Sequence, residues 1–167
     1  MIPDLDGHEG AQTGRPGDAS ASPHRVDLTG EAADLLRRLT GLHGPLMFHQ
    51  SGGCCDGSSP MCYPDGDFIT SEADVHLGDL PVDGLPAPVP FRMSVSQYAY
   101  WRHTHLTVDV VRGRGSGFSV EAPEGVRFLI RSRLLTDDEL SAFGITSPRL
   151  TAPGRPVAQR GSGMPRG

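Results

Sequence analysis

The sequence contains no lysine: all 15 of its Lys-plus-Arg positions are arginine, against 20 acidic residues, so the net charge is −5. Without lysine, catalysis through a lysine Schiff base is excluded. The negative charge argues against nonspecific nucleic-acid binding, which depends on a surplus of basic side chains. Apolar residues make up only 37% of the chain, and no apolar run approaches the roughly 18 residues that a membrane span needs. We therefore expect no nucleic-acid partner and no membrane span.

The chain also begins without a basic segment followed by an apolar one, so no secretory signal is expected and a cytoplasmic location is the default. In that reducing compartment the three cysteines do not predict a disulfide framework, because they are odd in number and close together. They are Cys54, Cys55 and Cys62. Metal binding, redox chemistry and buried packing are the remaining interpretations.

Glycine and proline are abundant, at 22 and 15 residues of 167. This composition favours loops and short strands over long helices. Residues 1–25 and 146–167 contain too few large apolar side chains to offset the entropy of ordering them. We expect both segments to be disordered tails, and we expect residues 26–145 to form one globular domain around the cysteines.

Within that domain, leucines at helical spacing over 35–42 predict an N-terminal helix. Thr136 and Glu139 have the spacing of a capping box and predict a short C-terminal helix. A further short helix is expected at 95–102. Alternating apolar residues and turn residues predict strands at 45–50, 67–71, 74–78, 89–94, 105–112, 117–121 and 126–134. The fold is therefore predicted to be α+β, a single compact domain of six or seven short, mostly antiparallel strands in a sandwich or small barrel.

The segment from His49 to Cys62 is rich in groups that bind metals. Thiolates are strong ligands for zinc, Cu(I) and the iron of iron–sulfur clusters. Gly52 and Gly53 let the backbone wrap closely around a bound group. Adjacent cysteines rarely bind one ion together, so one of Cys54 and Cys55 acting with Cys62 is the more natural starting pair.

Histidines can complete such a site. His103 and His105 are two residues apart at the start of a predicted strand, so both should project from one face. His49 ends the strand that leads into the cysteine segment. We therefore predict a zinc or iron ion, or an iron–sulfur cluster, with candidate ligands Cys54, Cys55, Cys62, His49, His103 and His105.

Two other interpretations remain open. Free cysteine often packs as a small buried apolar residue, and the chain would then be a structural docking partner without metal. Alternatively, Cys54 or Cys55 is a nucleophile or half of a redox pair, with a histidine as base. The chain would then be a small thiol-dependent enzyme or redox switch. No recognisable nucleophile motif surrounds the cysteines, so no catalytic residue is assigned and a non-enzymatic role is favoured.

The cysteine segment also resembles a bacterial family of small proteins of unknown function. The similarity covers about residues 35–135 and is carried by Gly44–Cys62, Phe91–Ser94, Tyr100–Thr104, Asp109–Phe118 and Glu121–Phe128. Members of that family are often encoded beside NAD-dependent aldehyde dehydrogenases. The resemblance therefore implies an accessory role with an aldehyde dehydrogenase as partner, and it leaves room for a homo-oligomer.

A fainter similarity is to the A-type iron–sulfur carriers. Ser51–Cys54 is similar to their Ser-Gly-Cys turn, and Gly117–Pro123 is similar to a second stretch of theirs. Those carriers supply two further ligands from a Cys-Gly-Cys near the C-terminus. Here that place holds Arg131-Ser-Arg133, and no cysteine follows Cys62. The similarity implies a related fold with a different ligand set.

Overall fold

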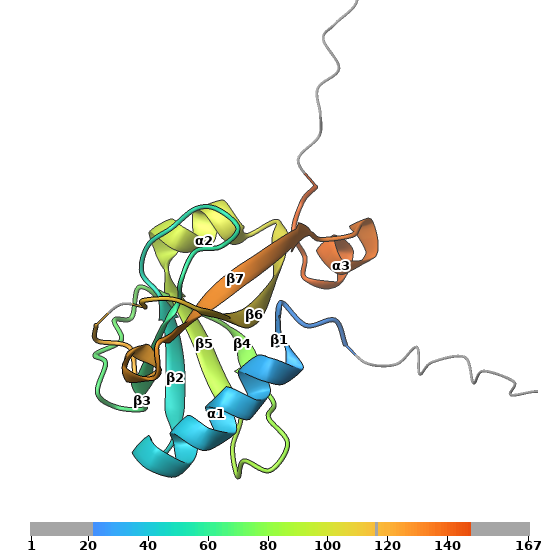
Figure 1. Cartoon of the computed structure of the whole chain (residues 1–167). Helices are drawn as coiled ribbons and strands as arrows, with labels where there is room; N and C mark the ends of the chain where they lie inside the picture. Colours follow the sequence, from blue (N-terminus) through green and yellow to red (C-terminus); the bar gives the residue numbers. More distant parts are fainter. Residues whose placement is uncertain (1–21, 116, 148–167) are drawn as a thin grey trace, which may run out of the picture.

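The computed structural model describes residues 22–115 and 117–147, and over these residues the chain forms three α-helices and seven strands in two mixed sheets (Figure 1). The first sheet has the order β1-β6-β7, formed by Val26–Leu28, Thr104–Arg112 and Val126–Leu134. The second has the order β3-β2-β5-β4, formed by Met61–Pro64, Leu46–Gln50, Val89–Ser94 and Asp74–Leu80. The arrangement is sandwich-like and not a closed barrel, which confirms the predicted α+β class.

The helices begin and end where the sequence places capping residues. The first, α1, spans Gly30–His43, and the Thr29 side chain accepts a hydrogen bond from the backbone N–H of Ala32. It ends at Gly44, whose φ of 80° suits glycine. The others are α2 (Val95–Trp101), the 3₁₀ turn η1 (Ala122–Glu124) and α3 (Asp137–Ala142), and α3 opens with the predicted capping box. In Figure 1, α1 lies at one end of the sheets and α2 at the other.

Strand pairing differs from the expectation in one respect. Three of the pairings are antiparallel, but β1 runs parallel to β6 and β2 runs parallel to β5. A parallel pair joins segments far apart in sequence, so no local pattern reports it. In β2 and β5 the parallel register places Phe48 beside Phe91.

Two predicted strands were wrong: residues 67–71 and 117–121 form turns and bends. Each of these segments contacts a neighbouring strand. The Phe68 ring packs at a tilt against the ring of His49, and the backbone N–H of Val120 donates to the Cys62 carbonyl oxygen. The short strands β1 and β3 were missed, because three or four residues carry too little alternation to be recognised.

The core lies between the two sheets and is centred on three phenylalanines. Phe48 in β2, Phe91 in β5 and Phe128 in β7 are all fully buried. The ring of Phe48 meets Phe128 edge to face at 4.9 Å between centroids and lies 5.8 Å from Phe91. Phe48 therefore connects its own sheet to the other one, in a geometry favourable for aromatic rings.

Arg25 connects the segment before β1 to α2 and to the end of α3. This buried side chain donates hydrogen bonds to the carbonyl oxygens of Trp101 and Arg102. Its guanidinium also lies 5.6 Å from the ring centroid of Tyr98 and 5.2 Å from that of Phe143. These contacts join the N-terminal segment to α2 and to the residue that follows α3.

The predicted tails, 1–25 and 146–167, lie almost entirely outside the described residues. Over the part of the chain that the structure does describe, no helix has both the length and the apolar character needed to cross a membrane.

The contact between Phe48 and the opposite sheet generates a stability prediction. Replacing Phe48 by Ala should lower the free energy of unfolding by about 3–5 kcal/mol, because it leaves a cavity between the sheets. Urea unfolding followed by circular dichroism measures this. The control is Leu42→Ala on the 69% exposed residue of α1. A loss for Phe48→Ala as small as for the control would contradict the assignment.

Candidate functional site

The loop that joins β2 to β3, residues 51–60 and here called the cysteine loop, is held on both sides of its cysteine pair. Before the pair, the Trp101 indole N–H of α2 donates to the Gly53 carbonyl oxygen at 3.2 Å. After it, Gly57 N–H donates to the Ile130 carbonyl oxygen of β7, and Ile130 N–H donates to the Ser58 carbonyl oxygen, both at 2.7 Å. The loop therefore lies between α2 and the edge of β7 (Figure 1).

Cys54 and Cys55 lie side by side at the surface of this loop. Both thiols are free and exposed, and their Sγ atoms are 3.4 Å apart. The hydrogen bond with Cys54 and the charge that Cys54 can carry raise the pKa of Cys55. Cys55 therefore keeps its proton to a higher pH than an ordinary cysteine. The arrangement is a dithiol in which one sulfur can be ionised while its neighbour remains a thiol.

Cys62 does not join this pair. It lies on β3 opposite Phe48, is 0% exposed, and packs within the apolar core. Burial raises the pKa of its thiol well above the ordinary value, and the carboxylate of Glu121 adds to the effect. A thiol in these surroundings is inert at neutral pH. In the described structure, Cys62 is a small core residue.

Glu121 is a buried acid that the sequence analysis missed. The residue is only 1% exposed, and its carboxylate accepts hydrogen bonds from the Ser119 hydroxyl and the Phe128 backbone N–H. Burial raises the pKa of its carboxyl group despite these hydrogen bonds. The alternating apolar and polar residues over 117–121 predict a strand, and that pattern does not indicate that Glu121 points inward beside a 3₁₀ turn.

His49 is the next-to-last residue of β2 and is 4% exposed. Its Nδ1 lies 2.7 Å from the Ser51 hydroxyl oxygen, and its Nε2 lies 3.3 Å from Oδ1 of Asp74 at the start of β4. A backbone hydrogen bond from Ser71, with a smaller contribution from His49, lowers the pKa of Asp74. The sequence indicates His49 as a candidate but not its neighbours Ser51 and Asp74, because Asp74 reaches the imidazole only through the arrangement of strands in the sheet.

His103 and His105 do not share a site. His105 is buried, with Nε2 2.9 Å from Oδ2 of Asp27 on β1, whereas the half-buried His103 accepts a hydrogen bond from Arg102. Over residues 22–115 and 117–147, no group of three or more His, Cys, Asp or Glu side chains is arranged to hold a metal ion. Of the six candidate ligands, the structure shows only Cys54 and Cys55 in contact. A metal site built from the six residues stays a prediction.

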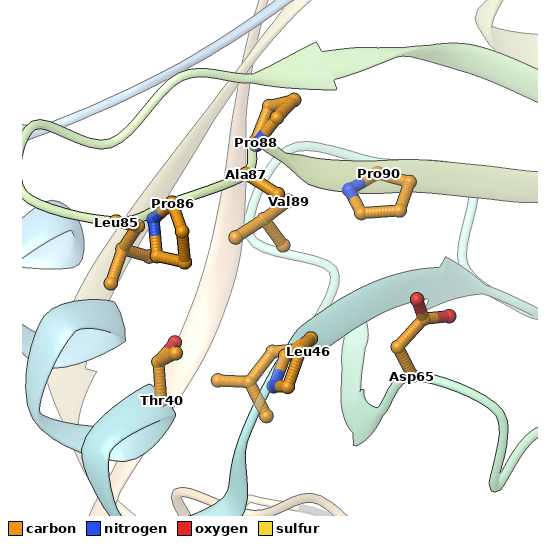
Figure 2. Close-up of a pocket in the computed structure, with 10 residues that line it drawn as sticks. Thr40, Leu46, Asp65, Leu85, Pro86, Ala87, Pro88, Val89 and Pro90 are labelled. Carbon is orange, nitrogen blue, oxygen red and sulfur yellow. The ribbon is translucent and has the colours of Figure 1, made fainter.

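A small pocket lies at the opposite end of β2 from the cysteine loop (Figure 2). It has a volume of about 100 Å³ and is lined by the end of α1, the start of β2 and the proline-rich segment 85–90. Thr40 Oγ1, in its wall, is buried without a hydrogen-bond partner among the described residues. The pocket shares no residue with the cysteine pair.

Comparison with known families places this site in context. The model of a family described as "Domain of unknown function (DUF779)" matches residues 35–134. The chain belongs to this family. The matched DUF779 region runs from α1 to the end of β7 and so contains the cysteine loop together with both elements that hold it. The sequence resemblance to a family of unknown function is confirmed. No curated protein and no solved structure matches the chain.

The contact between the two exposed thiols generates a prediction about reactivity. Replacing Cys54 by Ala removes the neighbour that raises the pKa of Cys55. At pH 8, iodoacetamide should then alkylate Cys55 faster than it does in the chain that retains Cys54, because a larger fraction of Cys55 is thiolate. Peptide mass spectrometry over time measures this, and Cys62 should remain unmodified until denaturant is added. A slower or unchanged rate at Cys55 would contradict the prediction.

The buried carboxyl of Glu121 generates a prediction about pH. The pKa of the Glu121 carboxyl group is raised above its ordinary value of 4.5 in the folded chain. Above pH 4.5 this group therefore stays protonated in the folded state after it has lost its proton in the unfolded state. This group therefore lowers the free energy of unfolding as the pH rises through that window. Glu121→Gln should gain stability relative to the unmodified chain between pH 4 and pH 8, as measured by urea unfolding. The exposed Glu72→Gln is the control, and equal pH dependence in both variants would contradict the prediction.

Proposed function

We propose that this chain is an accessory protein for an aldehyde dehydrogenase and that its working group is the dithiol of Cys54 and Cys55. The observation that carries the proposal is the 3.4 Å separation of two exposed Sγ atoms. The loop bearing them is hydrogen-bonded to α2 and to β7. A dithiol held in this way can exchange disulfides with a partner protein without first assembling its two sulfurs.

The exchange would proceed in two steps. The substrate is a mixed disulfide between the partner's cysteine and a low-molecular-weight thiol. The Cys54 thiolate attacks the sulfur of the low-molecular-weight thiol and forms a bond to it. The partner's cysteine leaves as a thiolate, which takes up a proton. Cys55 then loses its proton and attacks the Cys54 sulfur, releasing the low-molecular-weight thiol and leaving a Cys54–Cys55 disulfide. Two electrons pass from the dithiol to the mixed disulfide, and two molecules of a low-molecular-weight thiol restore the dithiol.

The choice of partner rests on the family resemblance together with this chemistry. Aldehyde dehydrogenases depend on a cysteine, and a reactive cysteine is prone to form mixed disulfides. A disulfide between adjacent cysteines strains the backbone, and strained disulfides are easily reduced again. The pair is therefore suited to repeated use.

A soft metal ion is the second candidate, favoured by the same two neighbouring sulfurs. Cys62 lies in the core, and His49, His103 and His105 have other hydrogen-bonding neighbours. Zinc or an iron–sulfur cluster would need further ligands beside Cys54 and Cys55. A partner protein or a second copy of this chain would supply them, which would make the metal a bridge between proteins.

The test uses an aldehyde dehydrogenase from the same organism, inactivated as a mixed disulfide on its catalytic cysteine. With a limiting amount of low-molecular-weight thiol, the unmodified chain should accelerate the return of activity. Cys54→Ser should not, because the attacking sulfur is gone. Cys55→Ser should accumulate a mixed disulfide on Cys54 that mass spectrometry detects. Equal recovery with the unmodified chain and both variants would overturn the proposal.

The same three proteins, isolated without oxygen, test the second candidate. Bound metal at one ion per chain or per pair of chains, lost in both variants, would support a metal site and would identify the ion through elemental analysis. Metal-free protein that folds normally would remove this candidate.

A further inference from the structure

The end of β2 places a hydroxyl, an imidazole and a carboxylate in contact. Ser51 Oγ lies 2.7 Å from Nδ1 of His49, and Nε2 of the same ring lies 3.3 Å from Oδ1 of Asp74. Each ring nitrogen therefore faces a different oxygen. Neither contact belongs to the cysteine pair.

The carboxylate determines which nitrogen holds the proton. Asp74 is held in place by Ser71, whose backbone N–H donates to Oδ2 at 2.9 Å. Nε2 of His49 is buried and makes no hydrogen bond among the described residues, but it faces the Asp74 carboxylate at 3.3 Å, and the negative charge of that carboxylate selects the ring tautomer with its proton on Nε2. Nδ1 is then free to accept the proton of the Ser51 hydroxyl. This is the division of roles used by a serine nucleophile, a histidine base and an orienting carboxylate.

Burial separates the three groups as such a site requires. The side chains of His49 and Asp74 are only 4% and 9% exposed, whereas Ser51 is exposed. The Phe68 ring covers the imidazole at 4.4 Å between centroids and itself stacks on Tyr63 at 5.0 Å. The base is therefore shielded from water while the hydroxyl can meet a substrate. The two aromatic rings offer an apolar surface beside it.

We propose that Ser51, His49 and Asp74 form a serine nucleophile site that transfers the acyl group of small activated esters to water. Ser51 and His49 are the catalytic residues, and Asp74 is the positioning residue. The inference is independent of the dithiol function, because it uses none of the cysteines.

The proposed reaction follows acyl-transfer chemistry. Ser51 Oγ attacks the ester carbonyl carbon, its proton passes to His49 Nδ1, and the carbonyl electron pair moves to oxygen. When that oxygen re-forms its double bond, the bond to the alcohol breaks and the alcohol takes the proton from Nδ1. Water then attacks the acyl group on Oγ, giving its proton to Nδ1, and the acyl acid leaves as Ser51 regains its proton.

The test is labelling by a fluorophosphonate, a probe that phosphonylates activated serines. It is done on the full chain with Cys54→Ala and Cys55→Ala, so that thiol reactions do not contribute. We expect label on Ser51, located by peptide mass spectrometry, and hydrolysis of p-nitrophenyl acetate by the same protein. Both should be lost in Ser51→Ala. The exposed Ser96→Ala, on α2, is the matched control and should behave as the parent.

Two further variants separate catalysis from local structure. His49→Gln should slow labelling by about 100-fold or more, the usual contribution of a general base. Asp74→Asn should also slow it, and Asp74→Glu should restore part of the rate. Absence of label on Ser51, or equal rates in the parent and His49→Gln, would overturn the proposal. Ser51→Ala changes an exposed side chain, so this comparison decides the matter even if a buried variant fails to fold.

Discussion

The packing of Phe48 against both sheets is the contact on which the rest of the molecule depends. β2 is buried at all five positions and pairs with β3 on one side and β5 on the other. Its Phe48 ring reaches across to Phe128 of the other sheet. Because β2 is held on three sides, its two ends are fixed in space. One end leads into the cysteine loop, and the other forms part of the wall of the small pocket.

The position of the cysteine loop is set by β2, which it follows, and by contacts with elements outside the sheet of β2. Reciprocal backbone hydrogen bonds join the loop to Ile130 of β7, and the Trp101 indole binds it from α2. The Asp56 carboxylate adds a hydrogen bond from Ser132. The exposed thiols therefore lie on a loop that is anchored to distant elements at Gly53, Asp56, Gly57 and Ser58. Such support keeps reactive groups in place for a partner.

Much of the local structure could be predicted from the sequence, because its causes are local. Leucine spacing and the Thr29 cap determine α1, and the capping box determines α3. The candidate site was found only in part. The sequence favoured a site in which one of Cys54 and Cys55 acts with Cys62, whereas the structure brings Cys54 and Cys55 into contact with each other and places Cys62 in the core. Pairing of β3 with β2 turns Cys62 into the core, and pairing partners are set by contacts far apart along the chain.

The sequence by itself determined the class of the fold, the positions of its main helices and strands, the absence of lysine chemistry and the presence of a thiol-rich loop. These follow from composition, periodicity and short-range capping. Only the tertiary structure decided which groups meet. It separated Cys62 from its neighbours, buried Glu121, and brought Asp74 to the imidazole of His49 across the sheet. These contacts depend on strand order and register, which arise from the burial of apolar surface by the whole chain at once.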